Sequence, residues 1–324
     1  MNSLKDTINK LREGINKDLG KKVALDLTVD KIKQVDQWIP MPEWFKALIG
    51  EGEGIPCGHI TQVIGETDTG KTSLIIQMMI ATQKAGGIVF MIDSEHKFPW
   101  KRFIRFGGNL DAVVPMIVNS LEEAWTAFDA MIEQVKNIRK LEPDLLIMMV
   151  WDSIAASIPD AILEGEAGQS HVAVQAKQNN QEVLKFRQSI RRNNIAAVLI
   201  NHSYFQMGGY GVPKEIIKGG KELGLQSTFI IKCQKMGWIT RTKNKVQQII
   251  GVKTKLRPFK GHLSDFKCIV ELFMCGDTVD YLSNTNALND AKSRFDEVMG
   301  NVKVDTIDEK ESKKTRKKKA TISE

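Results

Sequence analysis

The amino-acid sequence predicts an α/β fold: a mostly parallel twisted sheet, helices on both faces and an antiparallel extension at the C-terminal side. The first observation behind this prediction is a glycine-rich loop between a strand pattern and a helix pattern, starting at Gly65. The second is the alternation of short apolar runs with helical patterns up to Asn201, which is typical of parallel sheets. The third is the change after Asn201 to strand-like runs without long helices between them, which predicts the antiparallel extension.

The N-terminal region has the pattern of an arm. Apolar residues recur at helical spacing from Leu4 to Ile15, and a short strand-like segment, Lys22–Leu27, follows before two prolines interrupt. A Gly-rich segment then leads into the first strand of the core. We expect an arm over residues 1–45, a core over 46–280 and a short C-terminal segment over 281–324.

The segment Gly65–Ser73 (GETDTGKTS) matches the phosphate-loop pattern G-x-x-x-x-G-K-[ST]. A strand pattern, His59–Ile64, precedes it, and a helix pattern, Lys71–Ala85, follows it. In this context the backbone N–H groups of the loop and of the helix N-terminus point at phosphate oxygens. The expected phosphate-binding residues are Gly65, Glu66, Thr67, Asp68, Thr69, Gly70, Lys71, Thr72 and Ser73.

Two residues of this loop have distinct expected roles. Lys71 reaches the terminal phosphates, and the hydroxyl of Thr72 is offered to Mg²⁺. The sequence therefore predicts a nucleoside triphosphate with Mg²⁺ as the bound cofactor. The alternative is a chance match in a glycine-containing turn, which the correct strand and helix on either side disfavour.

The middle of the chain supplies the remaining parallel strands and their helices. Helix patterns cover Leu121–Arg139 and His171–Arg192. The apolar runs expected to be strands are Ile88–Ile92, Val113–Val118, Leu145–Trp151 and Ile195–Asn201.

Two carboxylates follow strands of the predicted sheet and could serve the phosphate loop. Asp152 comes directly after the apolar run LLIMMVW, the pattern of a strand that ends in a metal-binding acid; the alternative is a helix cap before Ser153. Glu95 follows the strand IVFMID and can orient the water that attacks the terminal phosphate. The alternative for Asp93 and Glu95 is an acidic loop over helix N-termini.

The C-terminal half begins with a Gly-rich segment that extends through Gly224. Its glycines let backbone N–H groups approach phosphates, and lysines at 214, 218 and 221 add positive charge. Such a loop is suited to binding the DNA backbone, and the alternative interpretation of this segment is an active-site lid. The strand-like runs after it are Thr228–Gln234, Gln247–Lys255 and Lys267–Met274.

Composition favours an intracellular protein with a polyanionic partner. The chain has 324 residues and a formal net charge of +7, and its longest apolar stretch is too short to span a bilayer. Four scattered cysteines without metal-ligand spacing are expected to be reduced. The run Lys313–Lys319 (KKTRKKK) predicts a solvated basic arm that either keeps the protein soluble or gathers nucleic acid.

Five ordered motifs give the chain a family resemblance: it resembles the RecA-type recombinases, and in particular their bacteriophage UvsX branch. The motifs are GIPCGHITQVIGETDTGKTS, FMIDSEH, VWDSIAASIP, EGEAGQSHVAVQAK and VLINHSYFQMGGYG followed by KGGKELG. They cover residues 54 to 275, and their order makes the match more specific than a lone phosphate loop. The resemblance implies a RecA-like P-loop ATPase core.

The resemblance also implies roles for individual residues. His202 stands where the family senses the γ-phosphate, and Lys253 and Lys255 match a lysine pair that reaches the ATP of a neighbouring subunit. From the residue pattern alone, Lys253 and Lys255 would be expected on the solvent-exposed face of a strand. Thr72 and Asp152 are the expected Mg²⁺ ligands, and Glu95, Lys71, His202, Lys253 and Lys255 the expected catalytic residues. The expected DNA-binding residues are Val172, Lys177, Met207, Gly208, Gly209, Gly219 and Gly220.

The sequence departs from the family pattern at two places. Pro99 and Arg102 stand where bacterial members carry an Asp and a Tyr near the adenine. After Asp280 there is no room for the globular C-terminal domain of the bacterial proteins, and the tail is basic instead of acidic. Base recognition and the function of the tail are therefore open.

The resemblance implies a DNA-dependent ATPase that forms a helical filament on single-stranded DNA and pairs it with homologous double-stranded DNA. Its expected partners are further copies of itself and single-strand-binding and mediator proteins, with no membrane. The expected location is the cytoplasm of a bacterial or phage-infected cell. The alternatives are a RecA-fold ring helicase or loader, a nucleotide-gated DNA-coating protein and, least favoured, a small-molecule kinase.

Overall fold

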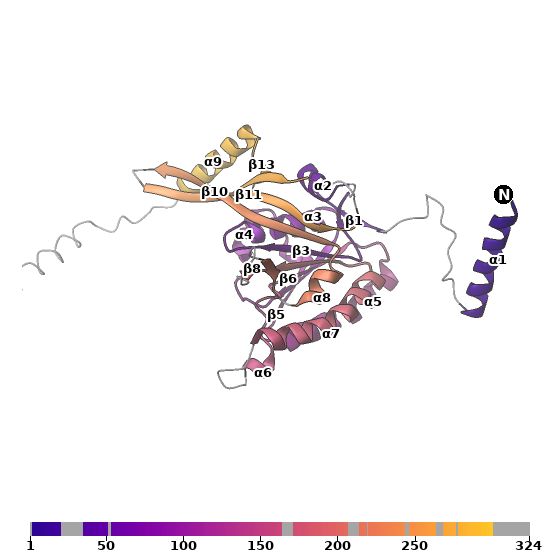
Figure 1. The fold of residues 1–324 in the computed structure, drawn as a ribbon. Coiled ribbons are helices and arrows are strands. Elements are labelled where there is room, and N and C mark those ends of the chain that lie inside the picture. Colours follow the sequence, from indigo (N-terminus) through magenta and orange to yellow (C-terminus); the bar gives the residue numbers. More distant parts are fainter. Residues whose placement is uncertain are drawn as a thin grey trace, which may run out of the picture.

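The structure is a computed structural model, and one large sheet dominates it (Figure 1). It describes residues 2–20, 35–50, 53–163, 171–206, 214–218, 220–243, 246–263, 268–276 and 278–300. Within these ranges nine strands form the sheet, in the order β13-β12-β11-β10-β3-β7-β6-β4-β5. The expected α/β class with a mostly parallel sheet is confirmed.

The parallel centre of the sheet contains the strands expected from the apolar runs. β3 pairs with β7, β7 with β6, β6 with β4 and β4 with β5, all in parallel. All six residues of β3 and of β7 are buried, as expected for strands covered on both faces. The strands are β3 (Ile60–Gly65), β4 (Ile88–Asp93), β5 (Val113–Ile117), β6 (Ile147–Asp152) and β7 (Ala196–Asn201).

Helices cover both faces of the sheet (Figure 1). On one face α3 (Lys71–Lys84) packs in an apolar cluster with α2 (Glu43–Ile49). On the other face α5 (Leu121–Leu141) and α7 (His171–Arg192) form the second cluster, centred on Trp125, Trp151 and Phe186. Shorter helices are α4 (Trp100–Arg105), the 3-10 turn η2 (Leu110–Ala112), α6 (Asp160–Leu163) and α8 (Lys221–Gln226).

The antiparallel extension after β7 is also confirmed. β10 (Phe229–Lys243) joins the sheet parallel to β3, and β11 (Val246–Gly261), β12 (Val270–Cys275) and β13 (Thr278–Tyr281) follow as antiparallel neighbours. The β10–β11 hairpin is longer than the apolar runs suggested, because its strands pair from Phe229 to Lys243 across three register shifts and its outer end continues as a two-stranded ribbon beyond β12. A separate pair, β8 (Ser203–Gln206) and β9 (Lys214–Ile217), follows β7.

The N-terminal region contains more structure than a plain arm. α1 (Asn2–Asp18) is the expected helix, and its apolar residues Leu4 and Leu11 are 68% and 61% exposed. β1 (Trp38–Pro40) pairs with β2 (Gly54–Pro56), and α2 between them buries Phe45 and Leu48 in the core. The strand-like segment at 22–27 lies outside the described residues.

A C-terminal helix is an element that the sequence reading missed. α9 (Thr285–Gly300) packs on the sheet through Ala291, which contacts the cluster around Phe273 and Cys275. Residues 301–324, including the basic run, lie outside the described residues. Among the described residues no helix combines the length and apolarity needed to cross a membrane.

Candidate active site

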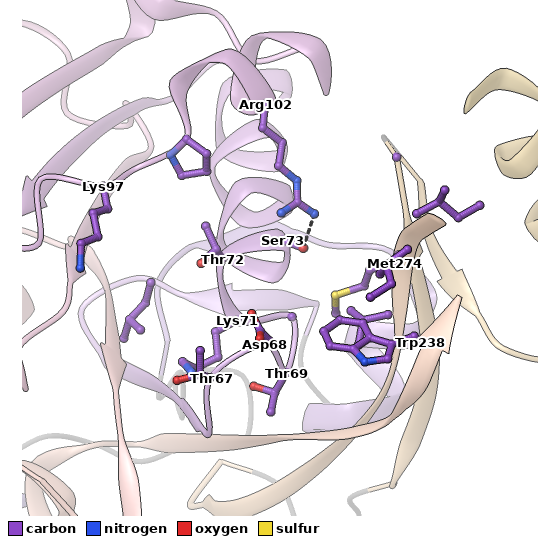
Figure 2. Close-up of a pocket in the computed structure, with 18 of the residues that line it drawn as sticks. Thr67, Asp68, Thr69, Lys71, Thr72, Ser73, Lys97, Arg102, Trp238 and Met274 are labelled. Atoms are coloured by element: carbon purple, nitrogen blue, oxygen red, sulfur yellow. Dashed lines mark hydrogen bonds between the residues drawn. The ribbon is translucent and has the colours of Figure 1, made fainter. Parts of the chain in front are cut away.

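A cavity of about 710 Å³ opens where the phosphate loop meets the C-terminal ends of the parallel strands (Figure 2). The loop residues from Thr67 to Ser73 form its floor, and α4 lies on one side. Residues of β10, β11, β12 and α9 form the opposite side, so the C-terminal extension closes the site. Ligands of open α/β sheets bind at this edge of the strands.

The phosphate loop has the backbone shape that its glycines allow. Gly70 has φ 92° and directly precedes α3, where no side chain caps the helix N-terminus. The N-terminal N–H groups of α3 are therefore available to an anion. Lys71 Nζ donates hydrogen bonds to the carbonyl oxygens of Gly65 at 2.9 Å and Glu66 at 2.6 Å, and burial lowers the pKa of this lysine.

The C-terminal extension holds the loop in place. Thr69 Oγ1 donates to Glu66 O at 2.9 Å, and the buried Thr254 Oγ1 on β11 donates to Thr69 O at 2.9 Å. Met274 on β12 lies so close that a Cβ on Gly70 would come within 2.5 Å of its sulfur. No local pattern could indicate this support, because Thr69 and Thr254 lie 185 positions apart along the chain.

Both expected carboxylates lie in the cavity next to Lys71. Asp152 ends β6, and burial, followed by the charges of Glu95 and Asp93, raises its pKa to about 7. Glu95 follows β4, and its Oε1 accepts a hydrogen bond of 2.8 Å from Ser153 Oγ. Asp152 and Glu95 are thus brought together as the sequence predicted, while Ser153 was missed.

Asp93 has a structural part in the site. Its buried carboxylate accepts the backbone N–H of Glu95 at 3.2 Å and that of Phe98 at 3.3 Å. These bonds shape the loop that carries Glu95 into the cavity. From the sequence, Asp93 was expected only as part of an acidic loop over helix N-termini.

His202 lies beside Glu95 at the end of β7. Its Nε2 is 3.9 Å from Glu95 Oε1, and burial, followed by the charge of Lys71, lowers its pKa. The backbone around it leads to the β8–β9 pair, because Lys218 N donates to His202 O at 2.9 Å and Asn201 Nδ2 donates to Lys218 O at 2.8 Å. His202 therefore lies between the cavity and the segment that was expected to bind DNA.

Lys253 and Lys255 do not line this cavity. Val252, Thr254 and Leu256 point toward the phosphate loop and its core, so the alternating lysines lie on the opposite face of β11. Lys255 Nζ forms a 2.8 Å ion pair with Glu271 Oε1. The two lysines are thus not part of the site formed by their own chain.

Only part of the expected DNA-binding set falls within the described residues. Met207, Gly208, Gly209 and Gly219 lie outside the described residues. Val172 and Lys177 belong to the first half of α7, where only the backbone is described. Gly220 is described, with φ 102°, at the position just before α8.

Three arginines also line the cavity: Arg102, which stands at the family's adenine-side position, and Arg105 and Arg294, which no sequence pattern indicated. Arg102 on α4 donates a hydrogen bond of 2.6 Å from Nη2 to Ser73 Oγ (Figure 2). Arg105 lines the same side, and Arg294 on α9 lines the opposite side. Spacing could not reveal them, because α4, α3 and α9 come together only in the folded chain.

The residues present fit a magnesium ion that is shared with a nucleotide. Among the described residues no group of three or more His, Cys, Asp or Glu side chains could hold a metal ion alone. Mg²⁺ at nucleotide sites uses one or two protein oxygens, waters and phosphate oxygens. Thr72 and Asp152, which both line the cavity, can provide such oxygens.

The fold and the site define a P-loop α/β protein whose sheet continues into an antiparallel extension. The family described as the RecA N-terminal domain matches residues 5–278, and the chain belongs to this family. It is 28% identical to the mitochondrial DNA repair protein recA homolog of Dictyostelium discoideum over 298 residues, 88% of this chain and 64% of that protein.

Two bacterial relatives give similar values. Protein RecA of Rhodopirellula baltica is 29% identical over 248 residues, 75% of this chain and 64% of that protein. Protein RecA of Rickettsia africae is 31% identical over 211 residues, 65% of this chain and 58% of that protein. The chain thus spans less than two thirds of the length of these three relatives.

Proposed function

We propose that the protein is an ATP-dependent DNA recombinase that forms a helical filament on single-stranded DNA and pairs it with a homologous duplex. The observation that carries this proposal is the position of His202 between Glu95 and the backbone of Lys218. Through His202 and the backbone bond to Lys218, the nucleotide site is connected to the β8–β9 segment. Family membership and the names of the relatives support the same function.

In this proposal ATP binds with its triphosphate over the N-terminus of α3. Lys71 exchanges its bonds to the Gly65 and Glu66 carbonyls for phosphate oxygens, which suits a desolvated ammonium group. Thr72 and Asp152 would hold Mg²⁺, whose charge would offset the negative charge that develops on the phosphates. Because burial raises the pKa of Asp152 to about 7, its carboxyl group would have to be deprotonated to hold the ion.

Glu95 is the proposed base that orients the attacking water. Ser153 donates to one carboxylate oxygen, which leaves the other oxygen for the water. His202, neutral because its pKa is lowered, then binds the γ-phosphate as a hydrogen-bond donor. Loss of that phosphate changes the position of His202 and of the Lys218 backbone bonded to it.

Self-assembly is supported by two exposed features. α1 displays its apolar stripe, and β5 is the terminal strand of the described sheet, with Val114 and Ile117 45% and 66% exposed. An arm that adds to such an edge buries both. Lys253 and Lys255, which face away from their own cavity, would then serve the nucleotide of the neighbouring subunit.

The finer assignments belong to the same proposal. We place the chain in the phage UvsX branch, with an arm over 1–45, a core over 46–280 and a C-terminal segment over 281–324. DNA contacts come from Val172, Lys177, Met207, Gly208, Gly209, Gly219 and Gly220, and single-strand-binding and mediator proteins are the expected partners. The expected location is the cytoplasm of a bacterial or phage-infected cell.

Steady-state hydrolysis and a pairing assay test this function together. We expect phosphate release from ATP to need Mg²⁺ and to rise with single-stranded DNA, and a labelled single strand to invade a homologous supercoiled duplex. A heterologous duplex is the matched control. DNA-stimulated hydrolysis with strand unwinding and no homologous pairing would contradict the proposal and favour a helicase.

A further inference from the structure

The cavity has two chemically different ends. Its carboxylates, Asp68, Glu95 and Asp152, come from the phosphate loop and from strand ends. The other end lies between α4 and the C-terminal extension, where Arg102 approaches from one side and Met274 from the other (Figure 2). A ligand that extends from the first end to the second meets these surfaces in turn.

The base of a bound nucleotide belongs at the second end. Lys71 and the neighbouring carboxylates define the position of the terminal phosphate. The phosphates nearer the sugar lie over the first turn of α3, and this turn includes Ser73. The sugar and base therefore continue past Ser73 into the space between Arg102 and Met274.

Apolar side chains there can hold a planar ring. Met274 is buried against Gly70 at the edge of the phosphate loop. Trp238 and Ile249, on the β10–β11 ribbon, line the same side of the cavity and are 40% and 58% exposed. Burial of such surface against a base favours binding without choosing between bases.

The polar side chains at this end, on α4, the β10–β12 strands and α9, are all arginines. Arg102, Arg105 and Arg294 all line the cavity, and Arg102 is held by its bond to Ser73 Oγ and by its position over the Phe106 ring, 5.0 Å from the centroid. A guanidinium group only donates hydrogen bonds. Of the side chains described on α4, the β10–β12 strands and α9, none that lines the cavity is a carboxylate or an amide.

These side chains can only donate hydrogen bonds, and this favours some base edges over others. Selecting adenine requires a hydrogen-bond acceptor for its 6-amino group, whereas a 6-oxopurine presents two acceptors, O6 and N7, that match one arginine. We propose that the site accepts 6-oxopurine nucleoside triphosphates, GTP and ITP, alongside ATP, and that Arg102 is the specificity-determining residue. This inference rests on one part of the proposed function, the binding of a nucleoside triphosphate in this cavity.

Competition binding with the full-length protein tests this proposal. A fluorescent ATP analogue is bound in the presence of Mg²⁺ and displaced by ATP, GTP, ITP or inorganic tripolyphosphate. We expect GTP and ITP to compete within about fivefold of ATP. GTP and ITP that compete more than about fiftyfold more weakly than ATP would overturn the inference and leave the proposed function standing.

The Arg102→Gln variant assigns the effect to one residue, with Lys101→Gln as the matched control. Lys101 is exposed on the same helix and does not line the cavity. Glutamine offers an acceptor to the 6-amino group, so R102Q should raise the ratio of ATP to GTP affinity about tenfold, while K101Q leaves the ratio unchanged. Equal weakening of all nucleotides and of tripolyphosphate would show that Arg102 contacts phosphate and would overturn its assignment.

Two further results distinguish failure of this inference from failure of the proposed function and from misfolding of the variant. Failure of every nucleotide and of tripolyphosphate to compete, with folded wild-type protein, would refute the proposed function and this inference together. Thermal melts followed by circular dichroism establish that R102Q is folded. If it is not, the wild-type competition series alone supports or overturns the acceptance of 6-oxopurines.

Discussion

Ser153 Oγ donates a 2.8 Å hydrogen bond to Glu95 Oε1, so the residue after β6 orients the carboxylate that follows β4. The neighbouring Asp152 ends β6 and faces the same cavity. One strand end thus provides both a candidate metal ligand and the group that positions the candidate base. Each part of this arrangement can be tested separately.

Replacing Glu95 with glutamine should separate binding from turnover. The amide keeps the shape of the side chain but cannot accept a proton, so ATP hydrolysis on single-stranded DNA should fall about 10²-fold to 10⁴-fold. Binding of ATP should stay within about threefold of wild type. Phosphate release and nucleotide titration measure the two effects, with Glu133→Gln on the exposed face of α5 as control. Retained turnover in E95Q would remove Glu95 from its role.

Removing the Ser153 hydroxyl should lower the rate of ATP hydrolysis less than E95Q does, because it acts through Glu95. In S153A the Glu95 carboxylate loses one hydrogen-bond donor and is held less firmly, so kcat should fall about tenfold with little change in KM. The E95Q/S153A double variant should turn over no more slowly than E95Q. Additive losses in the double variant would show that Ser153 acts independently of Glu95.

Thr254 should stabilise both the fold and the phosphate loop. Thr254→Val keeps the side-chain volume but leaves Thr69 O without its donor, which should lower the free energy of unfolding by about 1 to 2 kcal/mol. Urea denaturation measures this loss. Thr242→Val, at an exposed site of β10, is the control. Equal stability of T254V and T242V would contradict the importance of this bond.

The lowered pKa of His202 makes stability depend on pH in a defined direction. Burial and then Lys71 lower the pKa below 6.5, whereas Glu95 opposes the shift. The unfolded chain therefore binds the proton more readily, and stability due to His202 is lost as pH falls below about 6.5. The His202→Gln variant removes this dependence.

Denaturation of both proteins between about pH 5 and pH 8 measures the difference. The stability of wild type relative to H202Q should fall toward acid pH and stay constant above about pH 7. A relative stability that rises toward acid pH would mean that His202 gains a proton on folding, contrary to its burial beside Lys71.

The sequence was sufficient for the parts of the molecule that repeat a local pattern. The periodicity located His171–Arg192 with the bounds of α7, and the apolar runs located the parallel strands to within two residues. Glu95 and Asp152 were identified because acidic residues directly after strands meet at one edge of a parallel sheet.

The rest depended on contacts between segments far apart in the sequence. The bond from Thr254 to Thr69 and the approach of Arg294 and Trp238 to the cavity follow from the antiparallel extension folding back over the loop. α9 was missed because its apolar face is short and sits between polar stretches. Lys253 and Lys255 do not line the cavity of their own chain, so the contact that the motif predicts with the nucleotide of a neighbouring subunit stays a prediction.

Electron microscopy of the protein with single-stranded DNA, Mg²⁺ and a non-hydrolysable ATP analogue shows whether it assembles as a helical filament. We expect continuous right-handed helical filaments along the DNA that depend on the nucleotide. The Leu11→Lys variant, which places a charge in the exposed stripe of α1, should shorten or abolish them. Closed rings or isolated monomers on the DNA, with wild-type protein and bound nucleotide, would show that the protein does not act as a filament.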